Sequence, residues 1–156
     1  MLPVILGGCA TAGPAPQPPR PAPGATDYVT ADRAVTEYRQ AAAKLTLAPD
    51  WHWPADPEPS TGPDGAPQFY QLHAATNDAQ TLWFCSWVDR YSTATRPADR
   101  RSALASMRKL TGTYLYTQGS DAPAQALFRT VLKEAENGSV ALVRTFDDQN
   151  CQPLKR

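Results

Sequence analysis

The sequence predicts an all-α fold, a small bundle of four or five helices that carries a long proline-rich loop. Three observations predict this class. Apolar residues recur with a period near 3.6 in separate segments, and no segment shows sustained alternation of apolar and polar residues. Most of the 16 prolines fall in residues 14–23 and 49–67, which leaves the rest of the chain free to be regular. Hydrophobic residues make up 42% of the 156 residues, which is enough for a core.

The first helix is expected from residue 30 to a point before Pro49. One of its faces is apolar and consists of Ala31, Ala34, Val35, Tyr38, Ala41, Ala42 and Leu45. Residues 48–76 are then predicted to form a long loop, because proline removes amide donors and biases the preceding residue away from helix. Loops of this length are uncommon unless they pack down or carry function. The loop contains four aromatic residues, which are Trp51, Trp53, Phe69 and Tyr70.

The second helix is expected to begin at Asn77, which can act as its N-cap. Gln80, three residues later, completes a capping box. The large apolar residues of this helix are Trp83, Phe84, Trp87, Val88 and Tyr91. Because their spacing places them on one broad face, we expect them to form the centre of the core.

Two further helices are predicted from proline and capping signals. The third is expected near Pro97, since proline suits a first helical turn. Residues 111–120 break the helical pattern and are expected to form a loop or a short extended piece. Ser120 or Asp121, together with Pro123, is expected to open the fourth helix.

Asn137-Gly138 is predicted to end the fourth helix, because glycine readily adopts the left-handed conformation found after helices. Ser139 can cap a short final helix that runs through Phe146. We expect the helical domain as a whole to span residues 27–156.

The stretch Leu6-Gly7-Gly8-Cys9 resembles the lipobox of bacterial lipoproteins. The resemblance implies that a diacylglycerol is attached to Cys9 and that a signal peptidase cleaves before it. Residues 1–8 would then be a signal-peptide remnant. Because only eight residues precede Cys9 and none is charged, we expect the true start codon upstream or a truncated chain.

Residues 9–26 are expected to form a lipid-anchored, disordered tether. They are rich in proline and lack the aliphatic and aromatic side chains that a packed structure would bury. Proline favours the extended polyproline II form, which would hold a domain away from a membrane. The lipobox resemblance, with Ala10 after the cysteine, implies the outer membrane if the cell has two membranes.

Cys85 and Cys151 are predicted to form a disulfide. Cys85 lies to the side of the aromatic face of its helix, where a buried structural thiol would be less expected. An exported protein with two such cysteines most simply joins them. The alternative is a pair of free thiols in a cytoplasmic protein.

The sequence shows no pattern of catalytic or metal-binding residues, and we predict no enzyme, metal or cofactor. His52 and His73 have no partner ligands at a metal-binding spacing. The serines lack the GxSxG pattern, and no glycine-rich phosphate loop is present. The paired acids Asp147 and Asp148 stand near the end of the chain, where such acids are usually solvated.

Charged residues are distributed unevenly along the chain. Between Lys44 and Arg90 all charged residues are acidic, whereas the charged residues within 90–109 are basic except for Asp99. One interpretation is a patch that binds an anionic partner, with Arg96, Arg100 and Arg101 as candidate ligand-binding residues. The favoured alternative is that the acidic loop folds over the basic helix and neutralises it. Arg100 falls on the apolar face, so it is expected to stack on an aromatic ring or pair with an acid of the loop.

Trp51 and Trp53 flank His52 on the proline-rich loop, and both are candidate ligand-binding residues. Alternate residues of an extended segment point the same way, so both rings are expected on one side. They could cover an open edge of the core or stand exposed as a stacking platform for a sugar or peptide. We favour packing, since tryptophan is seldom left in water without cause.

Together these features predict a lipid-anchored extracytoplasmic protein that acts as a non-catalytic binding or scaffolding module at the bacterial cell envelope. The alternatives are an envelope enzyme acting on peptidoglycan or polysaccharide, and a regulatory or inhibitory lipoprotein that binds an envelope enzyme. The expected partners are the membrane, through the lipid on Cys9, and an envelope polymer or protein. Nucleic acid is not expected, because 15 basic residues balance 15 acidic ones.

Overall fold

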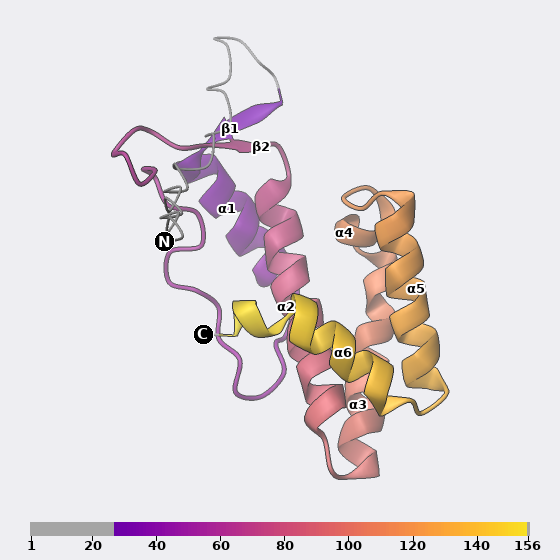
Figure 1. Ribbon diagram of the computed structural model, residues 1–156. Coiled ribbons are helices and arrows are strands. Elements are labelled where there is room, and N and C mark those ends of the chain that lie inside the picture. The colour runs from indigo at the N-terminus through magenta and orange to yellow at the C-terminus, as the bar shows by residue number, and fades with distance from the viewer. Residues whose placement is uncertain (1–26, 156) are drawn as a thin grey trace, which may run out of the picture.

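The computed structural model describes residues 27–155 (Figure 1). The predicted signal-peptide remnant (residues 1–8), the tether (residues 9–26) and the lipidation residue Cys9 lie outside the described residues. The elements in chain order are β1 (Tyr28–Thr30), α1 (Ala31–Ala42), β2 (Phe69–Gln71), α2 (Ala74–Thr93), α3 (Pro97–Met107), η1 (Arg108–Gly112), α4 (Tyr114–Thr117), α5 (Ala122–Glu136), α6 (Val140–Asn150) and η2 (Gln152–Leu154). The predicted all-α class is confirmed.

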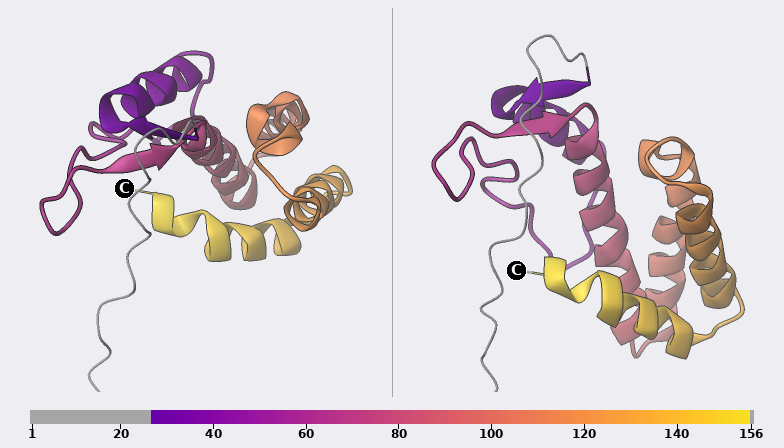
Figure 2. Two further views of the ribbon diagram at one scale, coloured as in Figure 1. Left: turned by 90° about the horizontal axis from the view of Figure 1, so that it is seen from above. Right: turned by 45° about the horizontal axis from the view of Figure 1, so that its top comes forward.

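Helix α2 is the central element of the fold. Helices α1, α3 and α6 each pack along it, and Figure 2 shows α1 on one side with α4 and α5 on the other. The main core joins α2 to α3, α5 and α6, and its largest fully buried apolar side chains are Tyr91, Phe84, Met107, Leu110, Val88, Val131 and Val143. A smaller cluster joins β1 and α1 to the first turns of α2. Because neighbours surround α2, its buried residues are not confined to one face.

The disulfide joins Cys85 to Cys151, whose Cα atoms lie 5.1 Å apart. It attaches the segment after α6 to the middle of α2. Both residues are almost fully buried, at 2% and 0% exposed. The predicted disulfide is therefore present, and Cys85 is buried because helices pack on several sides of α2.

Helix α2 begins at Ala74, three residues before the predicted start. His73 precedes it with a φ of 68°, and this left-handed residue turns the chain from β2 into the helix. The predicted capping box is therefore wrong. Asn77 lies in the first turn and donates its amide to the His73 carbonyl at 3.1 Å. The Gln80 side chain accepts a hydrogen bond from the Leu115 amide at 2.7 Å, which ties α2 to α4.

Two short strands were not expected from the sequence. β1 and β2 pair antiparallel, with Val29 opposite Tyr70. Each strand has only three residues, too few for an alternating pattern to be visible. Residues 111–120 also differ from the prediction, because they include the end of η1 and the short helix α4. The Thr113 hydroxyl accepts the Tyr116 amide at the start of α4.

Several helix ends follow the predicted signals. Pro97 occupies the first turn of α3, and the Asp121 carboxylate caps α5 by accepting the Ala124 amide at 2.9 Å. Gly138, with a φ of 79°, follows the end of α5. Ser139 precedes α6 without a side-chain capping bond, and α6 continues past Phe146 to Asn150 because its buried face extends to Asp147.

The proline-rich loop packs down onto α2 at its first residues. The Ser86 hydroxyl accepts the Ala48 amide at 3.0 Å, and the Trp87 indole donates to the Thr46 carbonyl at 2.9 Å. These bonds attach the start of the loop to α2. Later loop residues line a cleft together with residues of α1 and η2. None of the helices in residues 27–155 combines the length and apolar character needed to cross a bilayer.

Candidate functional site

Trp51 is buried in the main core, at 7% exposed. Its indole nitrogen donates to Asp89 Oδ2 at 2.8 Å, and Lys155 Nζ lies 5.8 Å from the ring centroid. The packing hypothesis therefore holds for Trp51. A core position leaves this ring unsuited to contact a ligand from solvent.

Asp89 joins the loop, α2 and the carboxy-terminal segment. It accepts hydrogen bonds from Trp51, from Gln152 Nε2 at 3.3 Å and from Lys155 Nζ at 2.8 Å. Burial raises the pKa of Asp89, but the hydrogen bonds from Lys155 and Trp51 outweigh it and leave the pKa below its usual value. This network holds the residues after Cys151 against the loop. No spacing of residues in the sequence predicted this network.

Trp53 differs from Trp51 because it is half-buried and lines a cleft. Its ring meets the Tyr38 ring edge-to-face, with centroids 5.9 Å apart and planes at 90°. It also contacts both hydrophobic clusters of the fold. Trp53 therefore combines packing with access to solvent.

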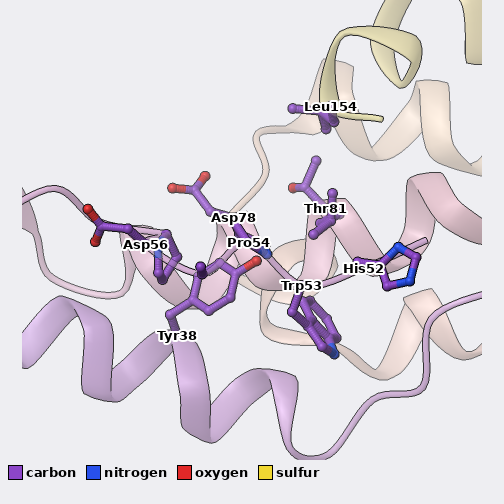
Figure 3. A pocket seen from close by; sticks show the side chains of 11 residues that line it. Tyr38, His52, Trp53, Pro54, Asp56, Asp78, Thr81 and Leu154 are labelled. Atoms are coloured by element: carbon purple, nitrogen blue, oxygen red, sulfur yellow. The ribbon is translucent and has the colours of Figure 1, made fainter. Parts of the chain in front are cut away.

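The cleft has a volume of about 600 Å³ and is built from four parts of the chain. Figure 3 shows the residues that form it, which come from α1, the proline-rich loop, α2 and η2. They are Tyr38, His52, Trp53, Pro54, Ala55, Asp56, Pro57, Asp78, Thr81, Leu82 and Leu154. The lining thus combines aromatic and apolar side chains with two carboxylates, Asp56 and Asp78, which are exposed.

A third acid, Glu58, lies beside this cleft and is buried at 3% exposed. It lines an adjoining hollow of about 470 Å³ together with Asp56, which also lines the cleft. Burial, together with the charge of the nearby Asp78 carboxylate and a hydrogen bond with it, raises the pKa of Glu58 to about 7. Burial also raises the pKa of Asp78, while the hydrogen bond from Glu58 opposes this. Glu58 is therefore the member of the pair that carries the shared proton.

The two tyrosines beside the acids respond to the same environment. Burial, with the charges of Asp78 and Glu58, raises the pKa of Tyr38 to about 12. Burial and the charge of Glu58 also raise the pKa of Tyr70. The Tyr70 hydroxyl donates to the Pro59 carbonyl at 2.7 Å, which holds the loop next to Glu58. The region accordingly has a negative potential.

We expect the stability of the fold to decrease between pH 4.5 and about 7 through Glu58. Below pH 4.5 the Glu58 carboxyl is protonated in the folded and the unfolded chain. Between pH 4.5 and about 7 the unfolded chain loses this proton, whereas the folded chain keeps it. The cost is on the order of 3 kcal/mol across this window. Glu58→Gln retains the hydrogen bond and removes this cost at pH 8.

Thermal melts at pH 5, 6, 7 and 8 measure this effect. Asp78 and Asp147 also have raised pKa values, so the comparison of Glu58→Gln with the wild type isolates the contribution of Glu58. A wild type and a variant with parallel pH profiles would contradict the assigned ionisation of Glu58.

The predicted basic patch does not meet the acidic loop. Arg90 and Arg96 both pair with Asp99, at 3.0 and 2.8 Å, and Arg108 pairs with Glu136 at 2.9 Å. The expectation that the acidic loop neutralises the basic helix was therefore wrong. Acids of α3 and α5 pair with these arginines, while Asp56 and Glu58 of the loop face α1 and α2.

Arg100 and Arg101, the other candidate residues of the basic helix, have different surroundings. The Arg100 guanidinium lies 5.9 Å from the centroid of Tyr91 and donates to the Ala94 carbonyl at 2.6 Å, so the stacking expectation is confirmed. Arg101 is exposed. Neither these residues nor Arg96 line the cleft beside Trp53.

The loop and Trp53 could be recognised in the sequence, whereas the acid pair of the site, Glu58 and Asp78, could not. Glu58 and Asp78 lie 20 residues apart in the chain, and no spacing rule connects them. The absence of basic residues between Lys44 and Arg90 was the one available signal. In the described part of the chain, no three histidine, cysteine or acidic residues are grouped so that they could hold a metal ion.

Comparison of the chain with protein-family models, curated proteins and solved structures finds no match.

Proposed function

We propose that this chain is a non-catalytic binding module at the bacterial cell envelope, and that its ligand occupies the cleft beside Trp53. The observation that carries the proposal is a half-buried aromatic ring next to carboxylates in a cavity of about 600 Å³. Small-ligand sites have volumes of about 300–1,000 Å³ and combine apolar walls with a few polar groups. The cleft has both properties.

The envelope location is supported by the lipobox resemblance of residues 6–9 and by the disulfide. A lipid on Cys9 would anchor the chain, and disulfides persist in oxidising compartments. Detergent-phase partitioning of the full chain expressed with an upstream signal sequence, compared with Cys9→Ser, tests the anchor. Equal partitioning of the two proteins would contradict it.

An envelope polymer is the ligand class that suits these walls. Aromatic rings such as Trp53 offer flat surfaces to sugar rings and to apolar side chains of peptides. Carboxylates such as Asp56 and Asp78 accept hydrogen bonds from hydroxyl and amine groups. Peptidoglycan presents sugar and peptide groups together, so it is the first polymer to test.

One observation favours the alternative of an envelope enzyme. A carboxyl group with a pKa near 7, such as Glu58, can act as a general acid. However, glycoside hydrolysis by two carboxyl groups needs them about 5–9.5 Å apart. Glu58 and Asp78 are in hydrogen-bonding contact instead, which supports binding as the role of the pair.

The proposal predicts that the chain co-sediments with purified peptidoglycan sacculi and that Trp53→Ala reduces the bound fraction at least about tenfold. The reason is the loss of an aromatic wall of the cleft. Tyr28→Ala is the matched control, because it removes an exposed aromatic ring, at 45% exposed, from β1, outside the cleft. Equal binding by wild type and Trp53→Ala would contradict the cleft as the ligand site.

The remaining alternative is a regulatory lipoprotein that binds an envelope enzyme. Affinity capture from detergent-solubilised membranes distinguishes it from a polymer binder. Recovery of one enzyme by the wild type but not by Trp53→Ala, without binding to sacculi, would favour the regulatory role.

A further inference from the structure

Glu58 is a buried acid with an unsatisfied oxygen. The residue is 3% exposed, and its Oε1 atom has no hydrogen-bond partner. A buried carboxyl oxygen without a partner is costly, and native proteins rarely retain one. Glu58 lines the hollow beside the cleft, so a donor from a ligand can reach it.

The surroundings of Glu58 contain acids but no cation that pairs with it. The ionisable groups around it are Asp32, Tyr38 and Arg39 of α1, Asp56 of the loop, Tyr70 of β2 and Asp78 of α2. Within residues 27–155, Arg39 and Glu58 take part in none of the ion pairs. The ionisable residues that line the cleft are Tyr38, His52, Asp56 and Asp78. A ligand with a positive charge would complement this charge distribution.

The shape of the site matches a cation on an apolar stem. Trp53, Tyr38, Leu82 and Leu154 line the cleft, and these side chains suit a chain of methylene groups. Asp56 lines both the cleft and the hollow, so the apolar walls of the cleft adjoin the acids. Aromatic rings beside the acids add attraction for a cation.

We infer that the cleft selects ligands with a primary ammonium group on an aliphatic stem, such as a lysine-type side chain, and that the ammonium binds between Glu58 and Asp78. This inference rests on the proposed function. An ammonium group has three donors and no acceptor, so it can satisfy the free Glu58 oxygen and the Asp78 carboxylate together. In doing so it replaces the proton that the two carboxyls share.

Replacement of that proton links binding to pH. If the ammonium binds only ionised Glu58, with a pKa of about 7 in the free protein, affinity rises about tenfold between pH 6 and pH 8. A ligand that hydrogen-bonds through hydroxyl groups would not show this rise.

The probes are Nα-acetyl-lysinamide and its Nε-acetylated derivative, which has the same stem without the charge. Binding to the full chain is measured by NMR titration at pH 6 and pH 8. At pH 8 we expect the charged probe to bind at least about tenfold more tightly than its Nε-acetylated derivative, a difference typical of a charge-assisted contact. Glu58→Gln and Asp78→Asn should each remove this preference, whereas Asp148→Asn, an exposed acid on α6, should retain it. Thermal melts of each variant verify folding.

Two results would overturn the inference. One is equal affinity for the two probes in the wild type, and the other is an unchanged preference in folded Glu58→Gln and Asp78→Asn. Binding to sacculi without binding of the charged probe would overturn the ammonium site and leave the proposed function in place. Absence of both would contradict the proposed function itself.

Discussion

Replacing Trp51 with alanine is expected to lower the free energy of unfolding by about 3–5 kcal/mol. The indole is buried in the main core, and its nitrogen is bonded to the equally buried Asp89. Removal leaves a cavity and takes away one of the donors that hold Asp89 ionised. Urea denaturation followed by circular dichroism measures the loss.

Trp53→Ala provides the comparison for Trp51→Ala. Trp53 is half-buried, and its main ring contact is the edge-to-face contact with Tyr38. The free energy of unfolding is therefore expected to fall by less in Trp53→Ala, by about 1–2 kcal/mol. A Trp51→Ala midpoint near that of the wild type would contradict the structural role of Trp51. Equal losses in the two variants would contradict the division between a core ring and a cleft ring.

Removing the disulfide with Cys85→Ala and Cys151→Ala together is expected to destabilise the domain by about 4 kcal/mol. The bond joins residues 66 positions apart, so it removes much conformational freedom from the unfolded chain. The thermal midpoint should fall by on the order of 10–20 °C, measured by differential scanning calorimetry. Cys9→Ser, which leaves the disulfide intact, is the control.

The same double variant is expected to weaken ligand binding. Cys151 precedes Leu154, which lines the cleft, and Lys155, which pairs with Asp89. Without the disulfide this segment has fewer attachments to α2. An unchanged midpoint, or two free thiols found by mass spectrometry in protein from an oxidising compartment, would contradict the role of the bond.

The helices with clear capping signals and an apolar stripe could be predicted from the sequence. Pro97 and Asp121 mark the starts of α3 and α5 because each acts through the backbone of its own helical turn. The start of α2 was missed because it depends on β2 pairing with β1, residues about 40 positions away in the chain. Capping rules consider only residues near the helix end in the sequence, so they do not include such a contact.

The candidate site was predictable only in part. The aromatic residues of the loop pointed to packing or binding, and the structure assigns packing to Trp51 while Trp53 lines the cleft. The contact between Glu58 and Asp78 is tertiary, so it leaves no pattern in the sequence. The pairing of Arg90 and Arg96 with Asp99 was not anticipated, although Asp99 lies within the same segment.

The central claim is that the cleft beside Trp53 binds an envelope ligand, and NMR of the tryptophan indoles tests it most directly. The chain has 4 tryptophans, and their indole N–H signals can be assigned by single Trp→Phe substitutions. On titration with soluble peptidoglycan fragments, the Trp53 signal should shift in a saturable way, while the signal of the buried Trp51 should move little. Saturable binding that leaves the Trp53 signal unmoved would contradict the account, and so would the absence of any response.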